Sequence, residues 1–296
     1  MFTLPRNPRF YRPRYILEAI PVFLFYGLCA ALPLDAASGF GGWLARTIGP
    51  LMGISRRAEH NLRRAMPELD ATARKKIIRG MWDNLGRVVA EYPHLSNLIA
   101  KNRIAIVGQE WLVDMAQQGR GGLIISGHLA NWETGPVTSA HFGAPMAVIY
   151  RAPNNPYVDW LIKRARLKVS AGAVPKGTDG AIRLMRHLRN KGCVGILIDQ
   201  KLNEGIDVPF FGIKARTTPA PAELGIRFGC PMVLARCIRR QGAYFSIEIR
   251  PVVLPHTDSR IADVAALTHT LTAQLESWIR EYPEQWLWLH NRWPKE

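Results

Sequence analysis

A short apolar run that leads into a histidine constrains this sequence more than any other feature. Residues 122–125 read GLII, which is typical of a buried strand, and residues 126–133, which follow at once, read SGHLANWE. Gly127 allows close approach of a neighbouring backbone, and open α/β folds bind their ligands at the carboxyl ends of strands. We therefore expect an α/β fold that presents His128 at the edge of a sheet.

His128 and Glu133 are the predicted catalytic pair. A neutral imidazole becomes a general base when a carboxylate fixes one ring nitrogen and the other nitrogen faces a substrate hydroxyl. Five residues along a continuous helix turn a side chain by roughly 140°, so His128 has to lie before the helix or in its first turn for Glu133 to reach it. A loop histidine beside an unrelated glutamate is the competing interpretation, and the spacing alone leaves both open.

The net charge predicts an anionic partner. The 296 residues include 39 Lys and Arg against 23 Asp and Glu, which gives a formal charge of +16. Such a surplus indicates nucleic acid, an acidic membrane surface or a phosphorylated substrate. The sequence has no zinc-finger, ribonucleoprotein or helix-turn-helix pattern, so no nucleic acid is expected as a partner.

A membrane surface suits the first 60 residues best. Arg6, Arg9, Arg12 and Arg14 precede an apolar stretch at 15–34, which is uncharged from residue 19 but shorter than the roughly 20 residues of a perpendicular span. We expect a spanning or shallow anchor with a cytoplasmic N-terminus, followed by an in-plane helix near 40–52. A cleaved signal peptide and a buried helical hairpin are the alternatives. The four cysteines lack metal-ligand spacing and predict buried thiols in a reducing compartment.

Hydrophobic periodicity predicts alternating strands and helices. Strands are expected near 122–126, 145–150, 194–198, 231–238 and 244–252. Helices are expected near 71–92, 132–141, 155–168, 178–190, 220–228 and 261–281. This alternation is typical of a mixed, partly parallel central sheet flanked by helices. We expect residues 1–60 to form membrane-anchoring or interfacial helices and residues 61–296 to form the α/β domain.

Polar residues at other strand ends are candidates for the same edge of the sheet. Arg151 follows the second strand in a proline-rich turn, and its planar guanidinium suits a phosphate, although pairing with an acidic residue is equally open. Asp199 follows the strand at 194–198 and, taken singly, is expected to be buried and to stabilise a turn. Residues 210–219 bring apolar, basic and hydroxyl side chains together.

Taken together, these motifs resemble those of the bacterial lipid A biosynthesis acyltransferases, almost from end to end. The motifs are Asn61-Leu62 with Pro67-Glu68-Leu69, WDNLG at 82–86, GHxxNWE at 127–133, Tyr150-Arg151 with Asn155-Pro156 and Asp159-Trp160, and Asp199-Gln200. Residues 283–293 are similar to the closing motif of that family, in which Pro-Glu-Gln leads to Trp, His and a basic pair. Asn291 departs from the first basic position, whereas Arg292 keeps the second.

The resemblance implies a glycerol-3-phosphate-acyltransferase-like fold at the cytoplasmic face of the inner membrane, with 61–296 as the acyltransferase domain. The donor would be an acyl carrier protein thioester, and the acceptor would be a hydroxyl of a 3-hydroxyacyl chain on a lipid A precursor. His128 would deprotonate this hydroxyl and Glu133 would orient His128, with no covalent acyl-enzyme, no cofactor and no metal. The backbone N–H groups from Gly127 to Ala130 are candidate donors to the oxyanion.

Basic and polar side chains would bind the substrates in this scheme. The predicted substrate-binding residues are Arg151, Asn131, Asp199, Lys176, Arg216 and Arg292. Part of the positive charge would dock the acidic carrier protein, and the rest would hold the enzyme against the anionic inner-membrane surface. Phe210, Phe211 and the N-terminal aromatic residues would line a slot for the acyl chain.

Three other functions stay open at this point. The first is an acyltransferase that acts on another lipid, such as a glycerophospholipid or an ornithine lipid. The second is a lipid hydrolase, in which His128 and Glu133 would serve Ser126 as nucleophile. The third is a non-catalytic module that binds headgroups at the membrane surface.

Overall fold

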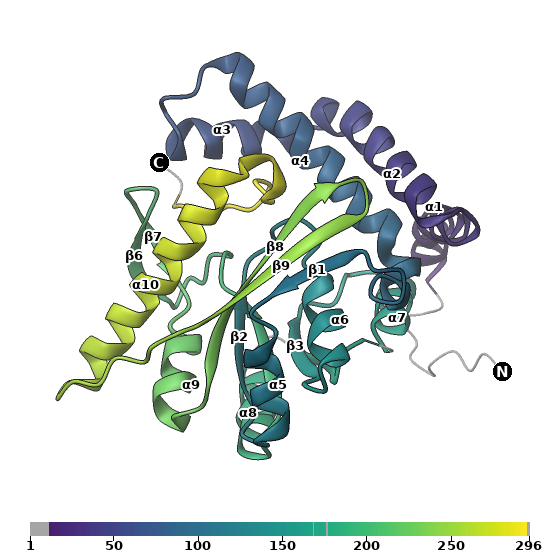
Figure 1. The fold of residues 1–296 in the computed structure, drawn as a ribbon. Helices are drawn as coiled ribbons and strands as arrows, with labels where there is room; N and C mark the ends of the chain where they lie inside the picture. The colour runs from purple at the N-terminus through teal and green to yellow at the C-terminus, as the bar shows by residue number, and fades with distance from the viewer. Residues whose placement is uncertain (1–11, 168, 176, 295–296) are drawn as a thin grey trace.

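A seven-stranded sheet forms the centre of the computed structural model, which describes residues 12–167, 169–175 and 177–294 (Figure 1). The strands lie in the order β1-β9-β8-β2-β5-β3-β4, and every neighbouring pair is parallel except β8 and β9. Their bounds are β1 Ile104–Val107, β2 Gly122–Ser126, β3 Met146–Tyr150, β4 Gly172–Pro175, β5 Cys193–Leu197, β8 Met232–Gln241 and β9 Tyr244–Pro251. A separate hairpin consists of β6 Ile206–Phe210 and β7 Ile213–Thr217. The predicted mixed, partly parallel sheet is confirmed.

Helices surround this sheet, and all six that periodicity predicts in the α/β part of the chain are present. The helices are α1 Pro13–Ala31, α2 Leu34–Ile48, α3 Ser55–Ala65, α4 Ala71–Glu91, α5 Glu110–Gln117, α6 Thr134–His141, α7 Pro156–Arg166, α8 Thr178–Arg189, α9 Ala220–Phe228 and α10 Arg260–Glu281. Three short 3₁₀ turns are η2 Gly49–Leu51, η3 Tyr92–Asn97 and η4 Pro283–Gln285. The prediction missed α3, α5, β1, β4, β6 and β7, most of them too short to show a clear period.

Local sequence signals set where the longer helices begin. The side chain of Asp70 accepts a hydrogen bond from the backbone N–H of Ala73, which caps α4. Asn155 caps α7 through the N–H of Tyr157, and Pro156 takes the first helical position, where its missing N–H costs nothing. These caps fix the polar turns that surround the carboxyl edge of the sheet.

The sheet separates two hydrophobic cores. Along β2, Leu123 and Ile125 face one core together with α4, α9 and α10, whereas Ile124 faces the other core together with α5 and α6. Side chains alternate across a strand, so a strand buried on both faces is apolar at every position. This double burial accounts for the uninterrupted apolar run before His128.

The N-terminal helices lie on the outer side of α4, which separates α2 from the sheet (Figure 1). Helix α1 is long and apolar enough to cross a membrane, and its Leu17 and Leu24 are 68% and 69% exposed. The predicted apolar helix is therefore present and is a candidate membrane anchor, while Arg6 and Arg9 lie outside the described residues. Helix α3 continues through the predicted boundary at residue 60, and that division into two parts stays a prediction.

The four cysteines are buried free thiols, as expected from their spacing. Burial raises the pKa of Cys193 and Cys237 to about 11, so both thiols stay protonated and unreactive at neutral pH.

Candidate active site

His128 and Asp199 meet at the carboxyl edge of the sheet. His128 follows the end of β2 by two residues and Asp199 follows the end of β5 by two residues. These two strands are parallel neighbours in a register that places Ser126 opposite Leu197. Both residues come two positions after the ends of strands that run in the same direction side by side. Their side chains therefore lie next to each other.

Asp199 makes three hydrogen bonds that involve both of its oxygens. Its Oδ1 lies 2.8 Å from Nδ1 of His128, and its Oδ2 accepts from the backbone N–H of His128 at 2.9 Å. The same Oδ2 accepts from the indole N–H of Trp286 at 2.8 Å. The carboxylate is fully buried, so His128 is fixed through both its backbone and its ring.

The electrostatics of this contact determine the ionisation of Asp199 and the position of the proton on His128. Burial alone would raise the pKa of Asp199, but the charge of His128 and the hydrogen bonds from His128 and Trp286 hold that pKa well below its ordinary value. Asp199 is therefore ionised and can only accept hydrogen bonds, which assigns the proton to Nδ1 of His128. The side chain of His128 is 16% exposed, and its Nε2 has no hydrogen-bond partner among the described residues and can accept a proton.

Glu133 does not orient His128, so this part of the predicted catalytic pair is wrong. Glu133 lies just before α6, and its carboxylate is turned toward η3 and α7. It forms a buried ion pair with Arg166, whose Nε donates at 2.8 Å, and accepts from the hydroxyl of Tyr92 at 2.7 Å. Burial, with the charge of Glu133, raises the pKa of Tyr92 well above its ordinary value, so this phenol remains a donor.

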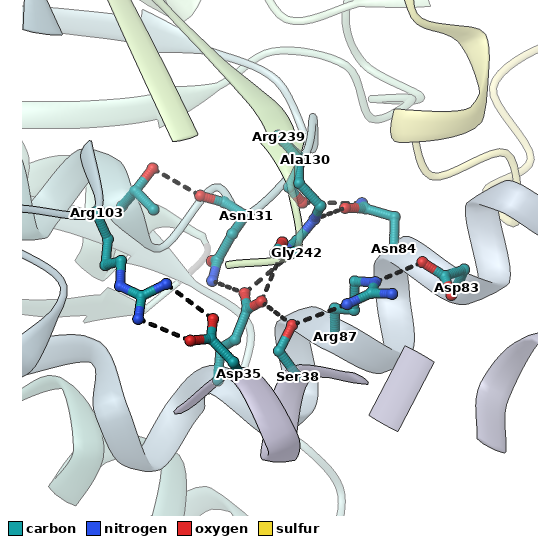
Figure 2. A network of polar contacts seen from close by, with 12 residues as sticks. Asp35, Ser38, Asp83, Asn84, Arg87, Arg103, Ala130, Asn131, Arg239 and Gly242 are labelled. Carbon is teal, nitrogen blue, oxygen red and sulfur yellow. Dashed lines mark hydrogen bonds and ion pairs between the residues drawn. The ribbon is translucent and has the colours of Figure 1, made fainter. Parts of the chain in front are cut away.

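Asn131 supports the loop rather than the substrate, so its predicted substrate-binding role is also wrong. Its side chain is fully buried, its Nδ2 donates to Glu91 at 2.8 Å and its Oδ1 accepts from the backbone N–H of Glu133 at 3.0 Å. Figure 2 shows Asn131 within a network of polar contacts between the loop, α2, α4 and β8. Both the nitrogen and the oxygen of this amide thus have partners within the protein.

The same network holds the loop through its backbone. The side chain of Asn84 donates to the carbonyl of Ala130 at 3.0 Å and accepts from Nε of Arg239 at 2.9 Å (Figure 2). Arg239 forms a buried ion pair with Glu91 at 2.5 Å. Ala130 has a φ of +47°, a left-handed conformation that these surrounding contacts impose on a non-glycine residue.

The backbone N–H groups of residues 128–130 are not available to an oxyanion, which corrects that expectation. The N–H of His128 donates to Asp199, that of Leu129 to the carbonyl of Gly127 at 2.8 Å, and that of Ala130 to the carbonyl of Gln285 at 2.9 Å. A Cβ at Gly127 would lie 2.6 Å from the side chain of Leu275 in α10, so a side chain, and not the expected neighbouring backbone, approaches this glycine closely.

The C-terminal segment completes the surroundings of His128. The ring centroid of His128 lies 5.6 Å from that of His290 and 5.0 Å from that of Trp132, which it meets in a T-shaped contact. Burial and the charge of His128 lower the pKa of His290, and its Nε2 lies 3.2 Å from the side-chain amide of Gln200. The sequence pointed to this tail only as a motif, and no spacing signal showed that its Trp286 would contact Asp199.

Two of the predicted basic residues, Arg216 and Arg292, lie in contact with each other. Arg292 is fully buried, where it donates to the carbonyl of Arg216 and to the hydroxyl of Thr217 and stacks on Phe210, so it cannot bind substrate as predicted. Asp199 is equally closed to substrate. Arg216 is partly exposed and donates to the carbonyl of Asn203, and its binding role stays a prediction.

The two other basic residues of the predicted set are Arg151 and Lys176. Arg151 is exposed at the end of β3, and its predicted contact with phosphate stays a prediction. Lys176 lies outside the described residues. Within the described ranges, no group of three or more His, Cys, Asp or Glu side chains could hold a metal ion.

Comparison with known proteins gives consistent similarities along the chain. Residues 4–295 match the family described as bacterial lipid A biosynthesis acyltransferase. The lipid A biosynthesis lauroyltransferase of Escherichia coli is 25% identical over 99% of this chain and 96% of that protein, and the palmitoleoyltransferase of the same organism is 24% identical over 96% and 92%. A phosphatidylinositol mannoside acyltransferase of Mycobacterium tuberculosis is 28% identical over 37% of this chain and 34% of that protein.

Proposed function

Since this chain belongs to the bacterial lipid A biosynthesis acyltransferases, we propose that His128, oriented by Asp199, activates a hydroxyl group of a lipid A precursor for acyl transfer. The family accounts for acyl transfer onto lipid A. Our proposal adds the donor, an acyl carrier protein thioester, and the acceptor, the hydroxyl of a 3-hydroxyacyl chain. The observation that carries it is the 2.8 Å hydrogen bond between Asp199 and Nδ1 of His128, which leaves Nε2 free as a base.

The reaction proceeds in two balanced steps. Nε2 of His128 takes the proton of the acceptor hydroxyl while the oxygen forms a bond to the carbonyl carbon of the thioester. The bond from that carbon to sulfur then breaks, and the leaving thiolate takes the proton from the imidazolium. Asp199 stays ionised throughout and stabilises the imidazolium, as the carboxylate does in a Ser-His-Asp triad.

Other residues of the site hold this geometry. Trp286 fixes the second oxygen of Asp199, and Asn84 and Asn131 fix the loop that carries His128. Glu133 acts as a positioning residue, because its ion pair with Arg166 joins the start of α6 to the end of α7. Removing one partner of such a buried ion pair is strongly destabilising, because the other charge then stays buried without compensation.

We place the reaction at the cytoplasmic face of the inner membrane. The exposed apolar surface of α1 supports this placement, because lipid substrates do not leave the bilayer readily. The charge of +16 suits both an acidic carrier protein and anionic headgroups.

The first test of the proposal compares His128→Ala with the wild type. The full chain, purified in detergent, is given an acyl carrier protein thioester and a lipid A precursor with free 3-hydroxyacyl groups, and the product is identified by mass spectrometry. We expect a product heavier by one acyl chain and a rate that falls about 10²–10⁴-fold in the variant. His269→Ala, which removes an exposed imidazole from α10, is the matched control and should keep the wild-type rate.

The same assay separates the alternatives. Transfer only to a lysolipid would indicate an acyltransferase for another lipid, for which the partial similarity to the mycobacterial enzyme is the supporting observation. Release of free fatty acid that Ser126→Ala abolishes would indicate a hydrolase, although among the described residues no hydrogen bond joins Ser126 to His128. Unchanged turnover in His128→Ala would contradict the proposal.

A further inference from the structure

A polar hollow whose lining does not include His128 lies beside the loop network. It has a volume of about 450 Å³ and lies between α2, α4, η4 and the turn between β8 and β9. Six cationic side chains line it, and we call it the basic pocket: Arg46, Lys76, Arg79, Arg87, Arg239 and Arg240. The carboxylates in its lining are those of Asp83 and Glu284, so positive charge is in clear excess.

Four of the six cations of the basic pocket have an acidic partner, since Arg239 is paired with Glu91, Arg240 with Glu248 at 3.8 Å, and two arginines with Asp83. Arg46 and Arg87 share the single carboxylate of Asp83, at 2.7 and 2.5 Å. Burial would raise the pKa of Asp83, but the hydrogen bonds from the two arginines lower it, so this carboxylate is ionised. Lys76 and Arg79 are exposed, and neither makes an ion pair or side-chain hydrogen bond within the described part of the chain. A ligand that carries negative charge and several acceptor oxygens is therefore the chemistry that the pocket fits.

The surroundings of the basic pocket indicate where such a ligand comes from. Arg46 lies in the last turn of α2, three residues after Trp43, and both Trp43 and Ile48 in this part of the helix are 51% exposed. The chain continues into Leu51, which is 84% exposed, and Met52. Basic groups beside exposed aromatic and aliphatic residues are typical of a surface that lies at the level of lipid headgroups. Helix α1, with its own exposed apolar face, packs against α2.

We propose that the basic pocket binds the phosphate group of an anionic membrane lipid. Lys76 and Arg79 lie three residues apart on α4 and so share one face of the helix, from which both can reach one phosphate. The inner wall of the pocket includes Asn84 and Gln285, which also bond the backbone of Ala130 in the His128 loop. Lipid binding at this site would brace that loop while the enzyme is on the membrane. The proposal does not depend on the acyl-transfer chemistry, because it concerns binding alone.

The test measures vesicle binding with no acyl donor or lipid A precursor present. The full chain is floated with phosphatidylcholine vesicles that contain or lack phosphatidylglycerol, as the wild type and as Lys76→Gln/Arg79→Gln. The matched control is Arg186→Gln/Arg189→Gln, which removes the same charge from exposed positions on α8, at the bottom of the view in Figure 1 and far from α2 at the upper right. We expect the phosphatidylglycerol-dependent affinity to fall about 30-fold in the pocket variant, and less than about threefold in the control.

Three results would overturn the proposal. Equal losses of vesicle affinity in both double variants would mean that only the overall charge attracts the protein to anionic vesicles. Unchanged vesicle binding, with lost affinity for acyl carrier protein, would assign the pocket to the acidic protein partner. Unchanged vesicle binding, with a rise in melting temperature on addition of inorganic phosphate that only the pocket variant lacks, would indicate a site for free phosphate. Far-ultraviolet circular dichroism of both variants confirms that these exposed substitutions leave the fold intact.

Discussion

Three hydrogen bonds converge on the buried carboxylate of Asp199, and two of them come from one residue, His128. This arrangement fixes the orientation of the His128 imidazole ring. His290 then lies next to the ring as a second, partly buried imidazole. Two adjacent imidazoles cannot both carry a charge cheaply, which is why the proximity of His128 contributes to the lowered pKa of His290.

The lowered pKa of His290 predicts a pH dependence of stability. Below the ordinary value of 6.5, the unfolded chain binds a proton at this residue that the native protein does not bind. This contribution to stability is therefore fully present above that value and is lost as the pH falls toward the native pKa. We expect the free energy of unfolding, measured with urea, to fall less steeply between about pH 7 and pH 5 in His290→Gln than in the wild type. Parallel curves for the two proteins would contradict this account.

The partner of His128 could have been predicted at this scale from topology. Both His128 and Asp199 follow apolar strands by two residues, and the strand prediction placed both at one edge of the sheet. Proximity in sequence favours Glu133 as the carboxylate that orients His128. Where a loop leads into a helix, however, proximity in sequence does not predict which side chains are in contact. The buried contacts of Glu133 with Arg166 and Tyr92 join segments that are 33 and 41 residues away, and no local pattern indicates such pairs.

At the scale of elements, the contact between α2 and α4 depends on small residues. A Cβ at Gly86 would lie 2.1 Å from the carbonyl oxygen of Gly41, and a Cβ at Gly41 would lie 2.5 Å from the carbonyl oxygen of Gly86. The two helix backbones therefore touch at this point. The sequence suggested an in-plane amphipathic helix near residues 40–52, and the glycines were part of that pattern, but their packing role required the structure.

This contact predicts opposite effects for two glycines of the same helix. Gly41→Ala should lower the free energy of unfolding by about 1–3 kcal/mol or more, because the added methyl group meets backbone that cannot move aside. Gly39→Ala has nothing within 4 Å of the new Cβ and should be neutral or stabilising by up to about 1 kcal/mol, since alanine favours helix. Thermal unfolding of the two variants makes the comparison. Equal melting temperatures would show that the helices can separate without cost.

At the scale of the whole molecule, the exposed apolar residues are unevenly distributed. Many of them lie on α1, α2 and the turn that follows, whereas the α/β part has two closed cores. The sequence predicted both features, because continuous apolar runs and helical periods are local signals. It could not predict the strand order, because the pairing of β2 with β5 and β8 joins segments about 70 and 110 residues apart.

The uneven surface predicts that α1 carries most of the membrane affinity. Leu17→Glu/Leu24→Glu should reduce the fraction that sediments with membranes by at least about tenfold, because carboxylates are costly in hydrocarbon. The matched control is Val253→Glu/Ile261→Glu, which adds the same charge outside α1 and α2. These two apolar side chains are 88% and 86% exposed. Membrane association that drops equally in both variants would refute a specific role of α1.

The rate constant kcat of Asp199→Asn tests the central claim most directly. Asparagine keeps the shape of the side chain, but its amide N–H₂ can face Nδ1 of His128 and favour the tautomer with the proton on Nε2, which cannot act as a base. The account predicts that kcat for acyl transfer falls about 10²–10⁴-fold while the variant remains folded. A folded Asp199→Asn protein with a kcat within about threefold of the wild type would contradict the assignment of His128 and Asp199 as the reacting base and its partner.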